Sequence, residues 1–577
     1  MELHDDAGRA ISDGQGGRIS DGRPRSLVYD GRTALFFAAE LDTYRFGADA
    51  GVIEQLRVSD LGYRTRATDP AGVVAYPGLL DQAFEIDRKV SLDPAQASSR
   101  SDGAIRITNL GSAFDAFALP RNVDGRRVRV LVGQKAYDST RGLYVDPPYG
   151  SLRPFFQGLA GAWMVAEDVV TVPIRDTGYW TQRPAQSRLY AGTGGLEGGD
   201  ALKGKPVPMT RGGTQACPVL QVPPVQVDAV AQVWQWTDGP GTVVQLCEGG
   251  APVFTPAGDV ADLYAAAPAP GTYLTCNARG LFRLGSNPVG TITADVTGSW
   301  PVAGDVHTAV RMAYVLLSET LGMPSEFLDG TTFDAIDGQL PYVAGFFVAD
   351  QTTGLVLAQA LLASVGGRLS SSRSGQLRPF VLAPSLFGAT PAATLDLTTA
   401  VSVEPVALPS TLDPPPYRWQ VSYGHLYATQ ASGLIGVAAD DPVRKQFLAT
   451  ADRYAAWTDP AIQAAWVRPT DPAPIATFLL RQEDAQAVAE AAGDLWRDRP
   501  GYYNVEVPLD VAAGLDIGSV VRLVWPLSRL AAGVLGQIVG EQVRSHDNSV
   551  TFQVLLTRDI GAFDPAQFSG DFEGGST

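Results

Sequence analysis

Short segments in which polar and apolar residues alternate recur along the chain, and they constrain its fold more than any other feature. In GAIRITNL, Ile105 and Ile107 alternate with Arg106 and Thr108. In RRVRVLVG, which follows the turn-forming sequence NVDG, arginines alternate with three valines: Val128, Val130 and Val132. A period of two residues places neighbouring side chains on opposite faces of a strand. We therefore expect half-buried antiparallel sheet, with the arginines on its outer face.

The same alternation returns toward the C-terminal end. In YRWQVSYG, residues 417–424, aromatic residues and valine alternate with arginine, glutamine and serine. Four more segments follow in close order: GYYNVEVPLD, SVVRLVW, GQIVGEQVRS and NSVTFQVLLTRD. The last of them places four apolar residues on one face: Val550, Phe552, Val554 and Leu556. Four late strands in hairpin order indicate a second barrel or sandwich.

Helical patterns lie between these two groups of strands. DVHTAVRMAYVLLSETLG carries one apolar face, with Asp305 expected as the N-cap and Gly322 as the stop. TTGLVLAQALLASVGG predicts a second helix, and RLSSSRSGQLRPFVL predicts a hairpin that turns around residues 373–375. A third helix is expected near residues 482–498. The predicted fold class is mainly β with an α+β centre, built from several domains with barrel or sandwich character.

A chain of 577 residues is too long for one hydrophobic core. The N-terminal stretch contains ISDG at two places and has few apolar side chains that could be buried, so residues 1–25 are expected to form a flexible arm. We divide the remainder into a β-rich domain at 26–195, a connector with a small β module at 196–290, an α+β domain at 291–405 and a C-terminal β-rich domain with a helix at 406–577.

Composition narrows the class of protein. With 45 % hydrophobic and 18 % charged residues, the chain is expected to be folded and soluble. No apolar run approaches the ~18 residues of a membrane span, and the N-terminus has no hydrophobic signal core, so folding in a cytoplasm is expected. A formal net charge of −17 argues against tight binding of nucleic acid through its phosphates.

One stretch resembles a phosphate-binding loop. Gly199 is followed after four residues by Gly204 and Lys205, but the next residue is Pro206. Proline offers neither a hydroxyl group for magnesium nor an amide hydrogen for phosphate, and it disfavours the helix that such a loop needs. The segment is therefore interpreted as an exposed connection between domains.

Other candidate sites are weak. The cysteines, Cys217, Cys247 and Cys276, include no C-x-x-C pair, so buried thiols or one pair are favoured over a metal site, and the sequence does not decide between pairing and metal binding. Three aspartates, Asp329, Asp334 and Asp337, lack calcium-loop spacing and are expected in a solvated loop. Motifs of serine hydrolases, zinc proteases and dinucleotide-binding folds are absent. No catalytic, cofactor-binding or metal residue is predicted.

The order of these segments resembles one family, the hub or tip proteins at the distal end of long-tailed bacteriophages and related prophage particles. The resemblance spans about residues 26–560. It rests on DGAIRITNLGSAFDAF with VDGRRVRVLVG, on GDALKGKPVP as a connector, and on GTYLTCNARGLFRLGSNPVGTITADVTG. The second predicted helix with its hairpin, YRWQVSYG, LDIGSVVRLVWPL and VTFQVLLTRD also resemble the family.

This resemblance implies a structural virion protein at the tail tip or baseplate, assembled in the host bacterial cytoplasm. It implies a homotrimer below the tail tube that contacts the distal tail protein and a central fibre or spike. It also implies roles in tail assembly, host attachment and genome ejection, with DNA passing without specific binding. With two separated strand groups, residues 103–132 and 502–557, a trimer would present six strand-rich domains in one ring.

Two other functions stay open at this point. A cell-wall hydrolase could use two carboxylates brought together from distant strands. A glycan-binding tail module could stack sugars on Trp234, Trp236 or Tyr273, although buried core is the commoner fate of such aromatic residues.

Overall fold

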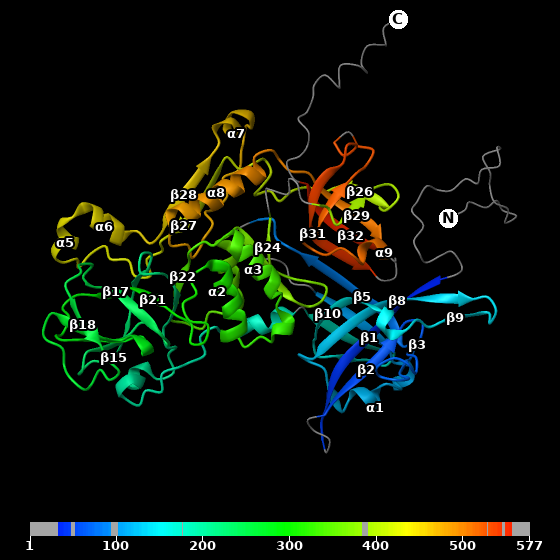
Figure 1. Ribbon diagram of the computed structural model, residues 1–577, viewed down its shortest axis with the longest axis horizontal. Coiled ribbons are helices and arrows are strands. Elements are labelled where there is room, and N and C mark those ends of the chain that lie inside the picture. Colours follow the sequence, from blue (N-terminus) through cyan, green and yellow to red (C-terminus); the bar gives the residue numbers. More distant parts are fainter. Residues whose placement is uncertain are drawn as a thin grey trace, which may run out of the picture.

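The computed structural model describes residues 33–47, 52–93, 102–175, 177–382, 390–527, 529–544 and 549–556. The predicted arm at residues 1–25 lies outside them. Two strand-rich regions, one from each end of the chain, lie side by side, and a helical centre links them to a smaller strand module (Figure 1). The predicted fold class, mainly β with an α+β centre, is confirmed.

One large sheet runs through both strand-rich regions. Its order is β2-β1-β8-β10-β12-β6-β5-β31-β32-β29-β26. The N-terminal strands are β1 Thr33–Arg45, β2 Ile53–Ser59, β5 Leu80–Lys89, β6 Asp102–Thr108, β8 Arg127–Asp138, β10 Arg153–Ala160 and β12 Val169–Arg175. The C-terminal strands are β26 Ser402–Pro405, β29 Tyr502–Pro508, β31 Val534–Arg544 and β32 Ser549–Leu556. β30 Val520–Leu523 also pairs with β31, and β25 Ala393–Leu395 pairs with β30.

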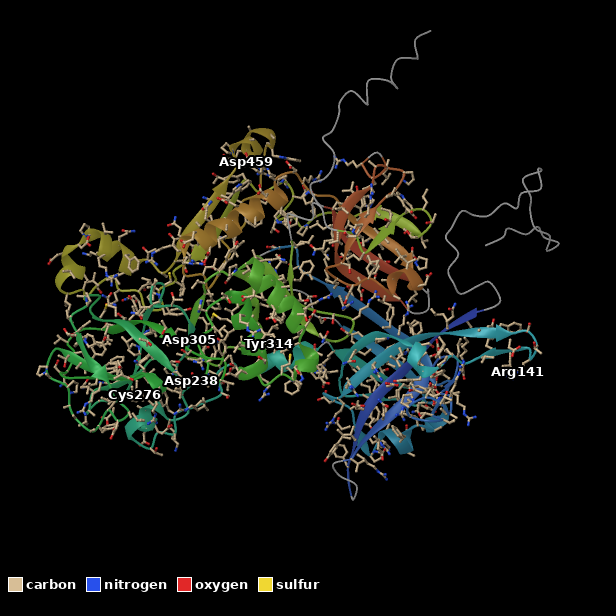
Figure 2. The ribbon with its side chains drawn as sticks, in the orientation of Figure 1. Arg141, Asp238, Cys276, Asp305, Tyr314 and Asp459 are labelled. Atoms are coloured by element: carbon tan, nitrogen blue, oxygen red, sulfur yellow. The ribbon has the colours of Figure 1, made fainter. Side chains whose placement is uncertain are left out.

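Shorter elements decorate the N-terminal region. They are β3 Tyr63–Arg64, β4 Ala75–Tyr76, α1 Asp115–Ala118, β7 Arg121–Asn122, β9 Leu143–Val145 and β11 Met164–Val165. The end of β8 pairs with β9 to form a hairpin that projects from the region, and Arg141 lies near its tip (Figure 2).

The predicted apolar faces are confirmed. Ile105, Ile107, Val128 and Val130 have no exposed surface, and all four apolar residues predicted on the last strand are buried. The predicted hairpin order of the late strands holds for β30, β31 and β32, but it is wrong for β29, which pairs with β32. Helix α9 Leu509–Ala512 follows β29 directly and carries the chain away before β30 begins.

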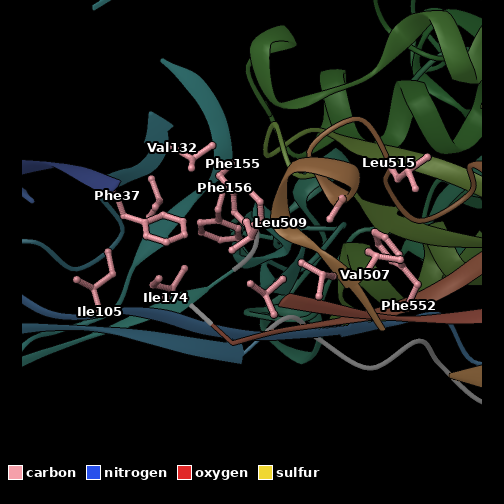
Figure 3. Packing of buried hydrophobic residues seen from close by; sticks show 14 of the residues in the cluster. Phe37, Ile105, Val132, Phe155, Phe156, Ile174, Val507, Leu509, Leu515 and Phe552 are labelled. Carbon is pink, nitrogen blue, oxygen red and sulfur yellow. The ribbon is translucent and has the colours of Figure 1, made fainter. Parts of the chain in front are cut away.

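The two strand-rich regions share one hydrophobic core. β5 pairs antiparallel with β31 over residues 85–89 and 540–544, so the sheet continues from one region into the other. Phe155 and Phe156 of the first region lie in the same apolar cluster as Val507, Leu509 and Phe552 of the second (Figure 3).

The centre contains α2 Ala309–Val315, which continues as a π-helical turn over Leu316–Thr320, and α3 Gly330–Gln339, α4 Gly354–Ala363, β23 Gly367–Ser371 and β24 Leu377–Val381. The predicted hairpin is confirmed as β23 and β24. The predicted N-cap is wrong, because Thr308 caps α2 and Asp305 instead accepts a hydrogen bond from Ser299. The chain before α2 is held extended, since His307 accepts from the Ala344 amide.

The remaining module holds two five-stranded sheets. One contains β13 Met209–Gly212, β14 Val219–Val222, β17 Gly241–Glu248, β21 Ile292–Gly298 and β22 Gly345–Val348. The other contains β15 Val225–Asp228, β16 Val233–Gln235, β18 Thr255–Asp259, β19 Thr272–Cys276 and β20 Leu281–Leu284. Because β22 of the centre pairs with β13, hydrogen bonds cross the division placed near residue 290, and the five-part division stays a proposal.

A hairpin and its helices complete the described chain. They are β27 Arg418–Tyr423, β28 Arg453–Thr458, α5 Gly436–Asp440, α6 Pro442–Ala449, α7 Pro460–Ala465 and α8 Gln482–Trp496. The helix expected at residues 482–498 is confirmed as α8. It packs on the hairpin so closely that a Cβ at Gly493 would lie 2.3 Å from the Trp457 ring.

Candidate functional site at the junction of the two strand-rich regions

Five charged side chains meet where the two strand-rich regions join, and we call them the junction cluster. Arg88 comes from β5 and Glu541 from β31, directly opposite each other in the strand register. Arg373 lies in the turn between β23 and β24, Arg378 lies on β24, and Asp516 lies between α9 and β30. The cluster therefore joins the N-terminal strands, the centre and the C-terminal strands.

Glu541 is the shared acceptor of the cluster. It is 2 % exposed, and Arg88 Nε donates to its Oε1 at 2.9 Å. Arg373 Nε donates to Oε2 at 3.0 Å. A second guanidinium nitrogen of Arg88 lies 2.7 Å from Asp516 Oδ1. Hydrogen bonds between ionised partners are short and stronger than neutral ones, so these contacts fix the side chains geometrically.

Arg373 connects the turn of the β23–β24 hairpin to both strand-rich regions. Its guanidinium lies 4.7 Å from the centre of the Phe155 ring and 5.7 Å from that of Phe552, so it touches both strand-rich regions. It also donates to the Ala512 carbonyl at 2.6 Å. Cations over aromatic faces are attracted by the ring quadrupole, which adds to the ion pairs.

The sequence of the turn explains its close approach. Gly375 has a φ of 76°, which favours glycine, and a Cβ there would lie 2.6 Å from the Gln157 carbonyl oxygen. The Gln157 amide in turn donates to the Arg373 carbonyl at 2.8 Å. A glycine is therefore required where the turn meets the backbone of β10.

The electrostatics favour the charged forms of Arg88 and Asp516. Burial by itself lowers the pKa of Arg88, but Asp516 and Glu541 outweigh it and raise that pKa above its ordinary value. Burial raises the pKa of Asp516, yet the positive charges of Arg88 and Arg378 outweigh it and lower that pKa. The five side chains form ion pairs with one another, and these pairs connect the two strand-rich regions and the centre.

Sequence reasoning missed this cluster, although a signal was present. Glu541 alternates with Val539 and Val543, both of which are buried. Arg88 is followed at the same spacing by buried Val90. A charged residue at an apolar position of an alternating segment indicates a buried partner of opposite charge, but the partner here lies more than 450 positions away in the sequence.

The structure places the phosphate-loop-like segment as predicted. Lys205 is exposed in a loop, where its carbonyl accepts from the Tyr190 amide at 2.9 Å. Pro206 forms an isolated bridge with Leu189, and the next regular element is the strand β13. The segment is an exposed loop, as expected, and its role as a connection between domains stays a prediction.

The cysteines are free thiols. Cys247 and Cys276 are buried and Cys217 is half-buried. Burial, followed by the charge of Asp295, raises the pKa of Cys247 to about 11. Within the described ranges, no three His, Cys, Asp or Glu side chains are grouped as metal ligands would be.

The prediction of a solvated loop around three aspartates is wrong, because they belong to α3. Asp329 is the N-cap and accepts from the Thr332 amide, while Asp334 pairs with Arg311 at 2.8 Å and Asp337 accepts from the amide of that arginine. The cap and the fully buried Phe333 stabilise a helix that the polar spacing did not indicate.

The candidate sugar-stacking residues lie in or against a core. Trp236 has no exposed surface and Tyr273 is 4 % exposed. Trp234 is half-buried and stacks on Phe282, with ring centres 6.4 Å apart. None of the helices described here is long and apolar enough to cross a membrane.

Comparison with known proteins gives matches in structure alone. No family model and no curated protein sequence matches the chain. A tail protein from Neisseria meningitidis MC58 matches over 91 % of this chain and 97 % of its own, with 9 % identity and a TM-score of 0.37. The 43 kDa tail protein of prophage MuSo2 from Shewanella oneidensis matches over 86 % and 98 %, with 9 % identity and a TM-score of 0.35.

A third match has the same character. The prophage tail protein gp18 from Listeria monocytogenes EGD-e matches over 90 % of this chain and 94 % of its own, with 8 % identity and a TM-score of 0.29. All three of these structures are described as tail proteins, and two of them come from prophages.

Proposed function

We propose that the chain is a structural virion protein, the hub that closes the distal end of a phage or phage-like tail. In this proposal three copies form a ring below the tail tube, contact the distal tail protein and hold a central fibre or spike. The hub supports tail assembly and host attachment, and it lets the genome pass. It works as a scaffold and has no catalytic site.

The observation that carries the proposal is the continuous sheet across the two strand-rich regions. β5 and β31 pair directly, the two regions share a core, and the junction cluster holds the centre against both. A trimer of such chains presents six strand-rich units with a fixed angle within each pair. Six units match a six-fold tube, while the three-fold axis matches a fibre or spike.

The net charge supports passage of DNA without binding. A chain with a formal charge of −17 repels phosphates over a Debye length of about 8 Å at physiological salt. Purified hub should therefore bind duplex DNA weakly at physiological salt, and sub-micromolar affinity in a mobility-shift assay would contradict this part of the proposal.

Electron microscopy of particles tests the proposal as a whole. An antibody against this chain should label the tail tip, and a reconstruction should show three copies whose strand-rich regions lie on one ring. Six copies, or three copies with those regions off one ring, would refute it. A zymogram against peptidoglycan distinguishes the hydrolase, because clearing by the purified chain requires catalysis.

A further inference from the structure

A cavity of about 530 Å³ lies beside α8, where the centre meets segments of both strand-rich regions. Residues of α3, α8 and the β23–β24 hairpin line it, together with Ser91 after β5 and Gln537 on β31. We call it the α8 cavity. Its volume is within the range of about 300–1,000 Å³ that is usual for small-molecule sites in proteins. Arg378 belongs both to its wall and to the junction cluster.

The sequence of α8 explains why space is left beside this helix. Ala487 and Ala491 are one helical turn apart, as are Val488, Ala492 and Trp496, and all five line the cavity. Alanine side chains are too short to fill the space between α8 and the opposite wall. Ala491 is exposed whereas Val488 and Trp496 are buried, so the cavity reaches the protein surface along α8.

The most buried lining residues are apolar. Leu92, Val365, Phe380, Ile475 and Ile517 all line the cavity and are between 2 % and 5 % exposed. They come from five separate segments of the chain. Apolar surface that a ligand removes from water stabilises its complex by about 25 cal/mol per Å². The cavity therefore favours a ligand with an apolar body.

Arg368 of β23 adds a buried positive charge to this apolar wall. It is 7 % exposed, and its guanidinium donates to the backbone carbonyls of Gly367 and Asp93 at 2.7 and 3.1 Å. In the described part of the chain, its Nε has no hydrogen-bond partner. The described lining residues include no aspartate or glutamate. A buried donor without an acceptor costs free energy, which a ligand that supplies the acceptor recovers.

A comparison with Arg88 shows how weakly the charge of Arg368 is compensated. At Arg88, the charges of Asp516 and Glu541 outweigh burial and raise the pKa. At Arg368, burial outweighs the charge of Asp93 and lowers the pKa to about 10. An anion beside Arg368 would supply the compensation that carboxylates supply at Arg88.

We propose that the α8 cavity binds a small amphipathic organic acid, with its carboxylate at Arg368 and its apolar body against Phe380 and Ile475. The carboxylate selects an anion over a neutral molecule of the same shape, and the apolar body selects an organic acid over an inorganic ion. The bound ligand contacts α8, the centre and segments next to both strand-rich regions, so it adds a further link between these parts. The inference does not depend on the proposed trimer.

Calorimetric titration of the full-length chain with decanoate tests the proposal. Decanoate carries a carboxylate on an apolar chain, 1-decanol has a similar chain without the charge, and acetate has the charge alone. We expect one decanoate to bind per chain, with 1-decanol and acetate binding roughly tenfold more weakly or less. Absence of decanoate binding up to about 1 mM, where the free energy of binding falls to about 4 kcal/mol, would overturn the proposal.

Substitutions of Arg368 test the role of its charge. Arg368→Met keeps an unbranched side chain and should weaken decanoate binding roughly 10- to 100-fold, while 1-decanol binding changes less than about twofold. Arg368→Lys retains the charge and should recover most of the affinity. Arg153→Met removes an exposed arginine of β10 and serves as the control, with no change expected. Equal losses for decanoate and 1-decanol in Arg368→Met would overturn the assignment of Arg368 as the anion partner.

Filling the cavity tests its position independently. Ala487→Trp places a large ring at the lining face of α8 and should abolish binding of decanoate and 1-decanol alike. Glu490→Trp adds the same ring at an exposed position of the same helix and should bind decanoate as the wild type does. Decanoate binding that persists in Ala487→Trp places the ligand elsewhere and overturns the proposal. None of these results depends on the oligomeric state, so failure here leaves the proposed hub standing.

Discussion

Replacing Glu541 with glutamine tests whether the junction cluster holds the two strand-rich regions together. The substitution keeps the size of the side chain, but it leaves Arg88 and Arg373 facing an amide group whose NH2 cannot accept. Loss of one partner of a buried ion pair costs about 3–5 kcal/mol. Arg88 keeps Asp516, whereas Arg373 loses the carboxylate that its guanidinium contacts, so we expect the lower value, about 3 kcal/mol.

Hydrogen exchange at β5 and β31 measures this effect locally, which matters because a chain with several domains does not unfold in two states. A loss of about 3 kcal/mol corresponds to roughly 100-fold faster exchange of amides that open with the junction. Glu404→Gln, on an exposed position of β26 in the same sheet, is the matched control and should change exchange less than about threefold.

A double variant identifies the cause. Arg373→Met removes the arginine that Glu541→Gln leaves unpaired, so combining the two should recover part of the lost protection. Unchanged exchange in Glu541→Gln, or strictly additive losses in the double variant, would refute the assignment of the cluster as the element that joins the regions.

Three further predictions concern single groups. Because the arginines hold the pKa of Asp516 below its ordinary 3.8, its contribution to stability is complete above about pH 4 and is lost as acid protonates the folded form; unfolding followed from pH 7 to pH 2 should show this loss, and Asp516→Asn should diminish it. Cys247, buried with a pKa of about 11, should react with iodoacetamide at pH 8 far more slowly than the half-buried Cys217, and equal rates in the folded protein would contradict its burial. Lys205→Ala should leave assembly intact, and magnesium-dependent ATP binding that this substitution abolishes would show that the loop is functional.

Local patterns predicted most of the strands. The alternation in residues 103–108 and 127–132 identified buried faces because each strand packs one face on a core, and that property is visible within a few residues. Strand partners were not predicted, since β29 pairs with β32 across an intervening helix and two strands. Pairing depends on the path of the connection, which alternation does not encode.

The predictions of helix boundaries were wrong where tertiary contacts override local sequence signals. Asp305 has the chemistry of an N-cap, but the backbone near His307 is already bonded to Ala344 as an extended segment. The segment of α3 was predicted as a loop because it is rich in polar residues. It is helical because Asp329 caps its N-terminus and Phe333 is buried against the core. The junction cluster could not be predicted from the sequence because its five members come from four distant segments.

The pairing of β5 with β31 has a consequence for synthesis of the chain. The two strands lie about 450 residues apart, as the 453-residue separation between Arg88 and Glu541 shows. While the ribosome makes the middle of the protein, the edge of β5 has no partner, and unpaired edges recruit foreign strands. Closure of so long a loop is slow. Chains cut short before residue 534 therefore carry an open edge, and they should aggregate during expression where the full chain does not.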